Sequence, residues 1–146
     1  IGCKKPYTNI RMASLSANAR FLDFFVDSVI AHREITITAP NQYASIMDVS
    51  DAVEGIVSVV DLKCIQRKDT YNLGPGVQYS ILAYAQSANE VSGAFGYAPT
   101  HIVVDDSSGN EFAICMDCSL LETQTGWRPL FSKSMMLEKL FKCKIG

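Results

Sequence analysis

The chain has 146 residues with a formal net charge of −2, and 48% of its residues are hydrophobic and 19% charged. A chain of this length is typically one domain, or a large part of one, and can bury a sizeable core. No basic run indicates nucleic acid as a partner, and no apolar stretch approaches the ~20 residues that span a membrane. The low charged fraction favours either a well-filled core or a face that packs on something outside the chain.

Strands and helices are expected to alternate along the first half of the chain. Strand patterns run over residues 7–15, 34–38 and 43–47. Residues 19–31 predict a helix with Asn18 as its N-cap. This helix is apolar around most of its circumference, so it should be heavily buried or docked. Residues 48–60 predict a second helix, because acidic residues crowd its first turn, although the β-branched residues there would also suit a strand.

The second half continues the same alternation. Strands are expected over residues 70–73, 101–104 and 112–116, and helices over residues 80–91 and 132–142. Ser119 and Glu122 have the spacing of a capping box that opens a short helix, which Gly126 should end. Trp127 should anchor the core beside that turn. The expected fold class is α/β, with short strands alternating with helices.

A glycine loop joins a strand to a helix within residues 71–82. Gly74 and Gly76 permit a positive φ or the close approach of another group, and Ser80 can cap the helix that follows. A loop of this kind presents backbone N–H groups at the helix N-terminus, where ligands often bind.

The polar residues form no recognisable catalytic motif. The glycine fingerprints of dinucleotide and phosphate sites are absent, as is the G-x-S-x-G elbow. His32 and His101 suit a helix end and an exposed strand edge better than catalysis. Asp48 and Asp51 are better explained by helix capping than by acid–base work. We therefore expect no catalytic residue in the chain.

The cysteines also argue against a metal or redox site. There are five, at irregular spacing, which predicts no disulfide framework and fits a reducing cytoplasm. Cys115 and Cys118 form a C-x-x-C pair, but a structural zinc site needs four ligands and no second pair occurs. Buried thiols are expected here instead.

Four segments, in order, resemble the C-terminal half of the extended short-chain dehydrogenase/reductases, above all the sugar-nucleotide epimerases and dehydratases. Residues 7–11 resemble the strand that follows the family's catalytic helix. Residues 49–55 resemble its V-x-D-[LV]-[AV]-x-[AG] helix start, and residues 71–82 its Y-N-L-G-x-G-V-x-x-S-V-L segment. Residues 117–129 resemble its terminal D-x-S…G-W-x-P pattern.

The resemblance implies that residues 1–146 form one substrate-binding lobe, which closes over a small-molecule substrate such as a nucleotide sugar. The family's Rossmann fingerprint and its Tyr-x-x-x-Lys pair lie upstream of this lobe, and neither occurs here, since the nearest match has Arg11 in place of Lys. NAD or NADP would then be bound by an upstream portion. That portion would also supply the catalytic Tyr and the contacts of a homodimer.

Nine positions match substrate-contacting positions of the family: Ser14, Arg20, Phe21, Thr38, Gln42, Ala44, Ile46, Ile81 and Ser108. Gln42 matches a recurrent Gln, whereas Ala44 and Ser108 stand where the family has the Arg residues that clamp the diphosphate. A bidentate Arg–phosphate contact is strong. The missing Arg residues therefore argue against the usual nucleotide-sugar substrate.

Three functions stay open. The first is the substrate-binding portion of an NAD(P)-dependent epimerase or dehydratase. The second is a non-catalytic binding or interaction module that keeps the fold of the lobe. The third is part of a reductase of the same superfamily that acts on a substrate without a diphosphate. The first requires an upstream coding segment with a glycine fingerprint and a Tyr-x-x-x-Lys pair.

Overall fold

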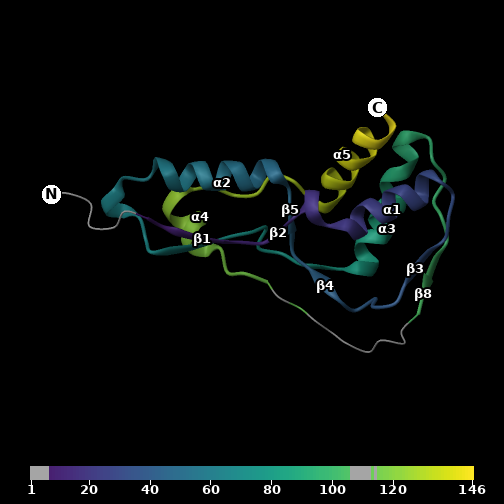
Figure 1. Cartoon of the computed structure of the whole chain (residues 1–146), viewed down its shortest axis with the longest axis horizontal. Helices are drawn as coiled ribbons and strands as arrows, with labels where there is room; N and C mark the ends of the chain where they lie inside the picture. The colour runs from purple at the N-terminus through teal and green to yellow at the C-terminus, as the bar shows by residue number, and fades with distance from the viewer. Residues whose placement is uncertain (1–6, 106–112, 114) are drawn as a thin grey trace.

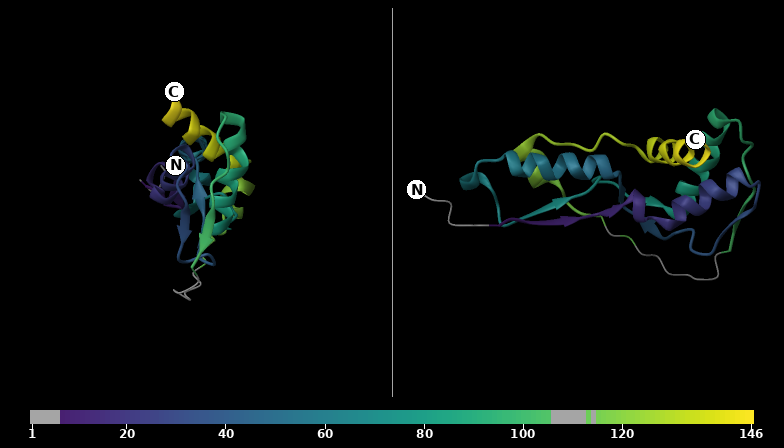
Figure 2. Two further views of the ribbon diagram at one scale, coloured as in Figure 1. Left: turned by 90° about the vertical axis from the view of Figure 1, so that its right-hand side faces the viewer. Right: turned by 45° about the horizontal axis from the view of Figure 1, so that its top comes forward.

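The computed structural model describes residues 7–105, 113 and 115–146. The chain is elongated and has two regions along its longest axis (Figure 1). The strand-pair region holds β1 (Asn9–Met12), β6 (Thr70–Leu73), α2 (Val49–Asp61) and α4 (Ser119–Thr125). The three-helix region holds α1 (Arg20–Ile30), α3 (Ile81–Ser92), α5 (Lys133–Ile145), β3 (Ile35–Ile37) and β8 (Ile102–Val104). Figure 2 shows the same two regions from further directions.

The three-helix region closes around its own core. α1, α3 and α5 pack on one another, and Phe141 of α5 stacks on Phe95 at a ring distance of 5.1 Å. β3 pairs with β8 in parallel and turns Ile35 and Ile37 into this core. The predicted burial of the first helix is confirmed, because its apolar face is buried at Leu22, Phe25, Val26 and Val29.

The strand-pair region is built on two parallel strands. β1 pairs with β6 so that Met12 lies opposite Leu73. Tyr71 and Leu73 point to the same face of the pair, since side chains alternate along a strand. Both are buried in a second core with residues of α2 and α4 and with Trp127, which confirms Trp127 as a core anchor.

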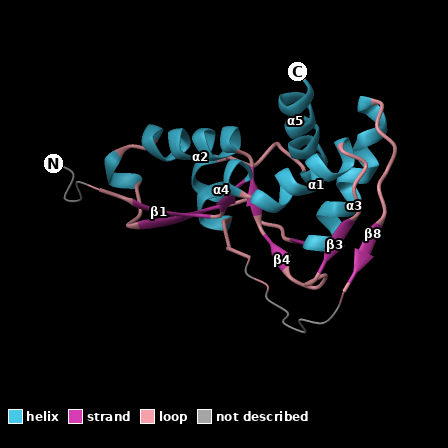
Figure 3. Cartoon of the chain, turned by 45° about the vertical axis from the view of Figure 1, so that its right-hand side comes forward, coloured by secondary structure: helices cyan, strands magenta, loops and turns pink. Residues whose placement is uncertain are grey.

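Two shorter strand pairs lie between these regions, where Figure 1 labels β2 and β5 and Figure 3 labels β4. β2 (Ser14–Leu15) pairs in parallel with β5 (Ile46–Met47). β4 (Tyr43–Ala44) pairs in the antiparallel sense with β7 (Tyr79–Ser80). The expected pattern of short strands alternating with helices is therefore confirmed.

Two predicted helix starts are wrong. Residues 16–18 form a 3-10 turn, so Ala19 is the N-cap of α1 and Asn18 is not. α4 begins at Ser119 itself, and the side chain of Asp117 accepts a hydrogen bond from the Ser119 N–H at 2.9 Å. The cap at Ser80, which accepts from the Ala83 N–H at 3.1 Å, is confirmed. Gly126 ends α4 with a φ of 73°, also as expected.

Three further points concern the described residues. Within the predicted strand over residues 112–116, Ala113, Cys115 and Met116 have irregular backbone. Residues 112 and 114 lie outside the described residues. Cys64 is disulfide-bonded, in contrast to the expected absence of a disulfide framework, whereas Cys115, Cys118 and Cys143 are free. No helix in the described ranges has the length and apolar character needed to cross a membrane.

Candidate functional site

Two adjoining cavities lie beside β2 and β4, between the two regions. The first has a volume of about 350 Å³ and is lined by Met12, Ala13, Ser14, Gln42, Tyr43, Ala44, Ser45 and Met116. The second has a volume of about 530 Å³ and is lined by Met12, Ala13, Ser14, Leu15, Asn18, Ala19, Arg20, Phe21, Ala44 and Ile46. Met12 to Ser14 and Ala44 line both cavities, so the two share a wall, and together they are called the hollow below.

The hollow lies where parallel strands end. Met12 is the last residue of β1, and Leu15 is the last residue of β2. Ligands of α/β proteins bind outside the carboxyl ends of such strands. The position of the hollow is therefore the one at which this architecture most often binds a small molecule.

The glycine loop supports one wall of the hollow. A Cβ on Gly74 would lie 3.1 Å from the Ala13 Cβ and 3.4 Å from the Met116 Cε, so glycine lets these two wall residues approach. Gly76 has a φ of 67°, which favours glycine. The loop therefore shapes the wall rather than opening a helix N-terminus toward a ligand, because Ser80 caps that terminus.

The segment after the glycines holds the opposite wall. β7 pairs with β4, which fixes Tyr43 and Ala44. The Ser45 hydroxyl donates to the Val77 carbonyl at 2.9 Å. The Ile81 N–H donates to the Gln42 carbonyl at 2.8 Å. Gln42 to Ser45 are thus held at both ends and in the middle by one segment of the chain.

Aromatic rings hold Phe21 in place at the edge of the larger cavity. Phe21 packs edge-on against Phe25 and Tyr84, with ring distances of 5.7 Å and 5.5 Å. The Tyr84 hydroxyl donates to the Ala44 carbonyl at 3.4 Å. Burial raises the pKa of Tyr84 above its ordinary value, so its hydroxyl keeps this proton. Tyr84 thus joins the aromatic cluster to the wall strand.

The described lining of the hollow offers mainly hydrogen-bonding groups. Ser14, Asn18, Gln42, Tyr43 and Ser45 carry polar groups, and Arg20 is the one charged side chain. No His, Cys, Asp or Glu occurs in this lining, and Tyr43 is its one member of the residue types that commonly transfer protons. Such walls can bind and orient a polar small molecule.

Six of the nine positions taken from the family resemblance line the hollow: Ser14, Arg20, Phe21, Gln42, Ala44 and Ile46. Thr38 directly follows β3 and is exposed, and Ile81 packs on the three-helix core. Neither lines the hollow. Ser108 lies outside the described residues. The sequence did not point to Met12, Tyr43, Ser45 or Met116, because the walls form by pairing of segments far apart in the chain, such as Ser14 with Ile46.

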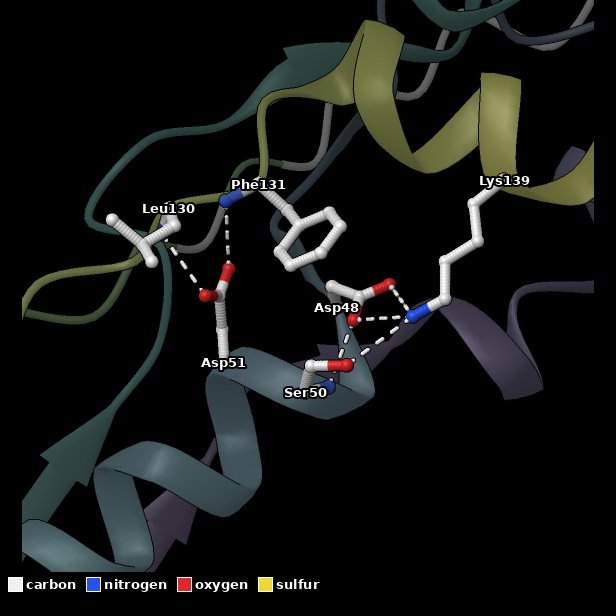
Figure 4. Close-up of polar contacts among 6 residues, drawn as sticks. All are labelled: Asp48, Ser50, Asp51, Leu130, Phe131 and Lys139. Atoms are coloured by element: carbon white, nitrogen blue, oxygen red, sulfur yellow. Dashed lines mark hydrogen bonds and ion pairs between the residues drawn. The ribbon is translucent and has the colours of Figure 1, made fainter.

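Asp48 is a structural residue (Figure 4). Its side chain is only 2% exposed and accepts from the Ser50 N–H at 2.8 Å and from the Lys139 Nζ at 2.9 and 3.1 Å. Burial alone would raise the pKa of Asp48, but the hydrogen bonds from Lys139 and Ser50 outweigh it and hold that pKa below its ordinary value. Its predicted role as a helix cap is confirmed.

Asp51 has a different structural role. Its two carboxylate oxygens accept from the N–H groups of Leu130 and Phe131 at 2.9 Å and 3.0 Å (Figure 4). The interpretation of Asp51 as a helix cap is therefore incomplete, because the carboxylate also ties α2 to the segment that leads to α5. Neither Asp48 nor Asp51 lines the hollow.

The remaining candidates for chemistry lie away from the hollow. His101 is exposed and pairs with Glu34 at 3.1 Å. Burial raises the pKa of the Cys118 thiol, which makes it a poor nucleophile. Across the described parts of the chain, no three His, Cys, Asp or Glu residues are placed to hold a metal ion.

No family model matches the sequence, and no curated protein matches it. Many solved structures, however, match its fold. UDP-N-acetylglucosamine 4-epimerase from Bacillus cereus matches with a TM-score of 0.80 and 15% sequence identity, over 95% of this chain and 48% of that protein.

Two further epimerases match in the same way. UDP-glucose 4-epimerase from Thermotoga maritima has a TM-score of 0.73 and 16% identity, over 96% of this chain and 47% of its own. UDP-glucuronic acid 4-epimerase from Bacillus cereus has a TM-score of 0.70 and 20% identity, over 94% of this chain and 44% of its own. That enzyme was solved with UDP-glucuronic acid and NAD. The chain therefore has the fold of a part of these enzymes and spans about half of their length. The resemblance indicated by the sequence motifs is confirmed at the level of fold.

Proposed function

We propose that this chain is the substrate-binding portion of an NAD(P)-dependent enzyme of the sugar-nucleotide epimerase and dehydratase type. The observation that carries the proposal is the convergence of Ser14, Arg20, Phe21, Gln42, Ala44 and Ile46 on one hollow at the ends of β1 and β2. These positions were selected from the resemblance alone, and they come from segments that are separate in the sequence. Their meeting at one cavity supports a shared role in binding.

The chain itself does not fit a nicotinamide cofactor. It has no glycine fingerprint after a strand, and Arg11 stands where a Tyr-x-x-x-Lys pair would need lysine. In this proposal NAD or NADP is held by a portion of the enzyme outside residues 1–146. The role of the chain is then to bind and orient the substrate, and no chemical step is assigned to its residues.

The hollow also supports a second candidate, a reductase of the same superfamily whose substrate lacks a diphosphate. Ala44 places a methyl group in the wall where the family has a phosphate-binding Arg. Arg20 is the single cation in the described lining. A diphosphate without Arg clamps loses strong charge-assisted hydrogen bonds, whereas a neutral substrate needs only the Ser, Asn and Gln groups present.

Calorimetric titration of the full gene product distinguishes these functions. The first function predicts that UDP-glucose or UDP-glucuronic acid binds, even without the Arg clamps, and that Ser14→Ala or Arg20→Ala weakens this binding by about tenfold. Ala44→Arg should restore a clamp and tighten UDP binding by about tenfold. Ala98→Arg, at an exposed alanine away from the hollow, is the matched control.

The outcomes separate three functions. Binding of NAD(P) without any UDP-sugar favours the enzyme with a diphosphate-free substrate. Binding of neither NAD(P) nor a UDP-sugar would favour the non-catalytic module and would overturn the proposal. An equal gain in affinity from Ala44→Arg and Ala98→Arg would show that the hollow is not the binding site.

A further inference from the structure

Cys115 and Cys118 are two free thiols that lie near each other and differ in exposure. Cys118 is only 4% exposed, whereas Cys115 is exposed, so the expectation of buried thiols is confirmed for Cys118 and wrong for Cys115. The carbonyl oxygen of Met116 lies 4.0 Å from the Cys115 Sγ and 3.6 Å from the Cys118 Sγ. The structure therefore places both sulfur atoms of the C-x-x-C pair around one backbone group.

Cys118 is the fixed member of this pair. Its carbonyl accepts a hydrogen bond from the Glu122 N–H at 3.2 Å, at the start of α4. Its thiol receives a backbone hydrogen bond from Gly74 of the glycine loop. The carbonyl just before it, that of Asp117, accepts from the Asn72 Nδ2 at 2.9 Å. Helix α4, strand β6 and the glycine loop therefore all hold Cys118 in place.

Met116 connects the cysteine pair to the hollow. Met116 lines the smaller cavity, and it lies between the two cysteines in the chain. The backbone of residues 115–118 contains no helix, strand or turn, whereas a disulfide holds its two Cα atoms within about 7 Å of each other. Joining Cys115 to a fixed Cys118 therefore bends the chain at Met116. Such a bend moves the Met116 side chain in the wall of the hollow.

We propose that Cys115 and Cys118 form a site of reversible thiol–disulfide exchange, and that closing their disulfide moves Met116 in the wall of the hollow. The oxidant is a low-molecular-weight disulfide. The Cys115 thiolate attacks one of its sulfur atoms, forms a mixed disulfide and releases one small thiol. The Cys118 thiolate then attacks the Cys115 sulfur and releases the second small thiol. The two cysteines lose two electrons, the oxidant gains them, and the two protons leave on the small thiols.

The exposure of the two thiols sets the order of these steps. A dissolved oxidant reaches Cys115 first, because Cys115 is exposed and Cys118 is buried. Burial also raises the pKa of the Cys118 thiol, so the attack by Cys118 is the slower step. The mixed disulfide at Cys115 should therefore accumulate before the internal disulfide forms. Formation of the disulfide does not depend on the substrate, whereas an effect on substrate binding rests on the proposed function.

Peptide mass spectrometry of the full gene product tests the exchange site. The protein is incubated with oxidised glutathione, unfolded in urea and alkylated at its free thiols. The peptide that carries residues 115–118 should lose both alkylation sites in most molecules, and dithiothreitol should restore them. Cys115→Ser should abolish the protection of Cys118. Cys143→Ser, at the exposed free thiol of α5, is the matched control and should leave that protection unchanged.

NMR of carbon-13-labelled methionine methyl groups tests the movement of Met116 without any ligand. The methyl signal of Met116, identified by its loss in Met116→Leu, should shift when the disulfide forms. The signal of Met135, on the exposed surface of α5, is the control within the molecule and should stay in place. Cys115→Ser, treated with the same oxidant, should show neither shift.

Three results would contradict these inferences in different ways. A mixed disulfide at Cys115 that never converts to the internal disulfide would overturn the proposal. So would protection of Cys118 that persists in Cys115→Ser, because the partner of Cys118 is then another thiol. An oxidised protein with an unshifted Met116 signal would overturn the link to the hollow. Absence of UDP-sugar binding in both the reduced and the oxidised protein would overturn only the proposed function.

Discussion

The two regions of the molecule differ in how completely their apolar surface is covered. In the three-helix region, α1, α3 and α5 cover one another, and the large side chains of Leu22, Tyr84 and Phe141 are fully buried. In the strand-pair region, α2 and α4 pack on β6 and its core, but five apolar residues of α2 are exposed, which we call the α2 stripe: Val49, Val53, Ile56, Val57 and Val60. Among the described residues, β1 pairs with β6 alone. The first region has a closed core, and the second has a core on one side and an uncovered apolar face on the other.

This difference shows that stability and function are distributed unevenly. The closed region supplies α1 and the aromatic packing behind the hollow, so it can hold binding residues in place by itself. The open region supplies the strand ends. The low charged fraction of the whole chain, 19%, is explained in part by this exposed apolar stripe.

The largest effect is expected inside the closed core. Phe141→Ala removes a fully buried ring that stacks on Phe95 and should lower the free energy of unfolding by about 3–5 kcal/mol. Phe24→Ala, on the same core's outer surface and 45% exposed, is the matched control and should cost less than about 1 kcal/mol. Urea unfolding followed by circular dichroism measures both. Similar losses for the two variants would contradict a closed core.

The joint between the regions should be the next most sensitive point. Asp51→Ala leaves the N–H groups of Leu130 and Phe131 without their acceptor and should cost about 2–3 kcal/mol in urea unfolding. Glu54→Ala removes an exposed carboxylate from the same helix and should change stability by less than about 0.5 kcal/mol. If the two variants unfold at the same urea concentration, Asp51 does not join the regions.

A smaller effect is expected where α2 lies on β6. A Cβ on Gly55 would clash with the Leu73 side chain and lie 3.1 Å from the Trp127 ring. Gly55→Ala should therefore destabilise the chain by about 1–2 kcal/mol, even though alanine favours helices. Gly93→Ala is the control, because no atom lies within 4 Å of its added Cβ and its φ is −59°. Gly93→Ala should raise the free energy of unfolding by about 0.5 kcal/mol. A lower free energy of unfolding for this variant would contradict the steric explanation.

The smallest effect depends on pH. The pKa of Asp48 in the folded chain is lowered, so its contribution is present above the unfolded pKa of about 3.9 and is lost as the pH falls through the folded value. Because Lys139 is half exposed, this contribution should be about 1 kcal/mol. Asp48→Asn should therefore lose less stability than the parent between about pH 5 and pH 2. Parallel curves in acid unfolding would show that the ion pair contributes nothing.

Local signals in the sequence predicted most of the described elements. The caps at Asp48 and Ser80 and the stop at Gly126 are confirmed, because each is decided by a side chain or a backbone angle within one helix turn. The predicted N-cap at Asn18 is wrong for a local reason too, since residues 16–18 form a 3-10 turn and α1 starts after that turn. The predicted cap at Ser119 is wrong because Ser119 is already the first residue of α4. Its N–H donates a hydrogen bond to the side chain of Asp117.

The hollow could not be predicted from periodicity. Its walls need β2 to pair with β5 and β4 to pair with β7, and nothing in either segment specifies its partner. Six of its residues were found only through the resemblance to a family, which carries the three-dimensional arrangement implicitly. The sequence also did not show that the α2 stripe stays exposed, because segments distant in the chain decide which face of a helix is covered.

The strand pairs also bear on how the molecule folds. In the described residues, each pair joins distant segments, for example Asn9 with Thr70 and Ile35 with Ile102. Contacts between distant segments form late, because the loop between them must close first. The helices need only local contacts and are expected to form earlier. The walls of the hollow, which depend on β2–β5 and β4–β7 pairing, would then be among the last parts to form and among the first to open. A ligand that binds there would therefore stabilise the part of the fold that forms last.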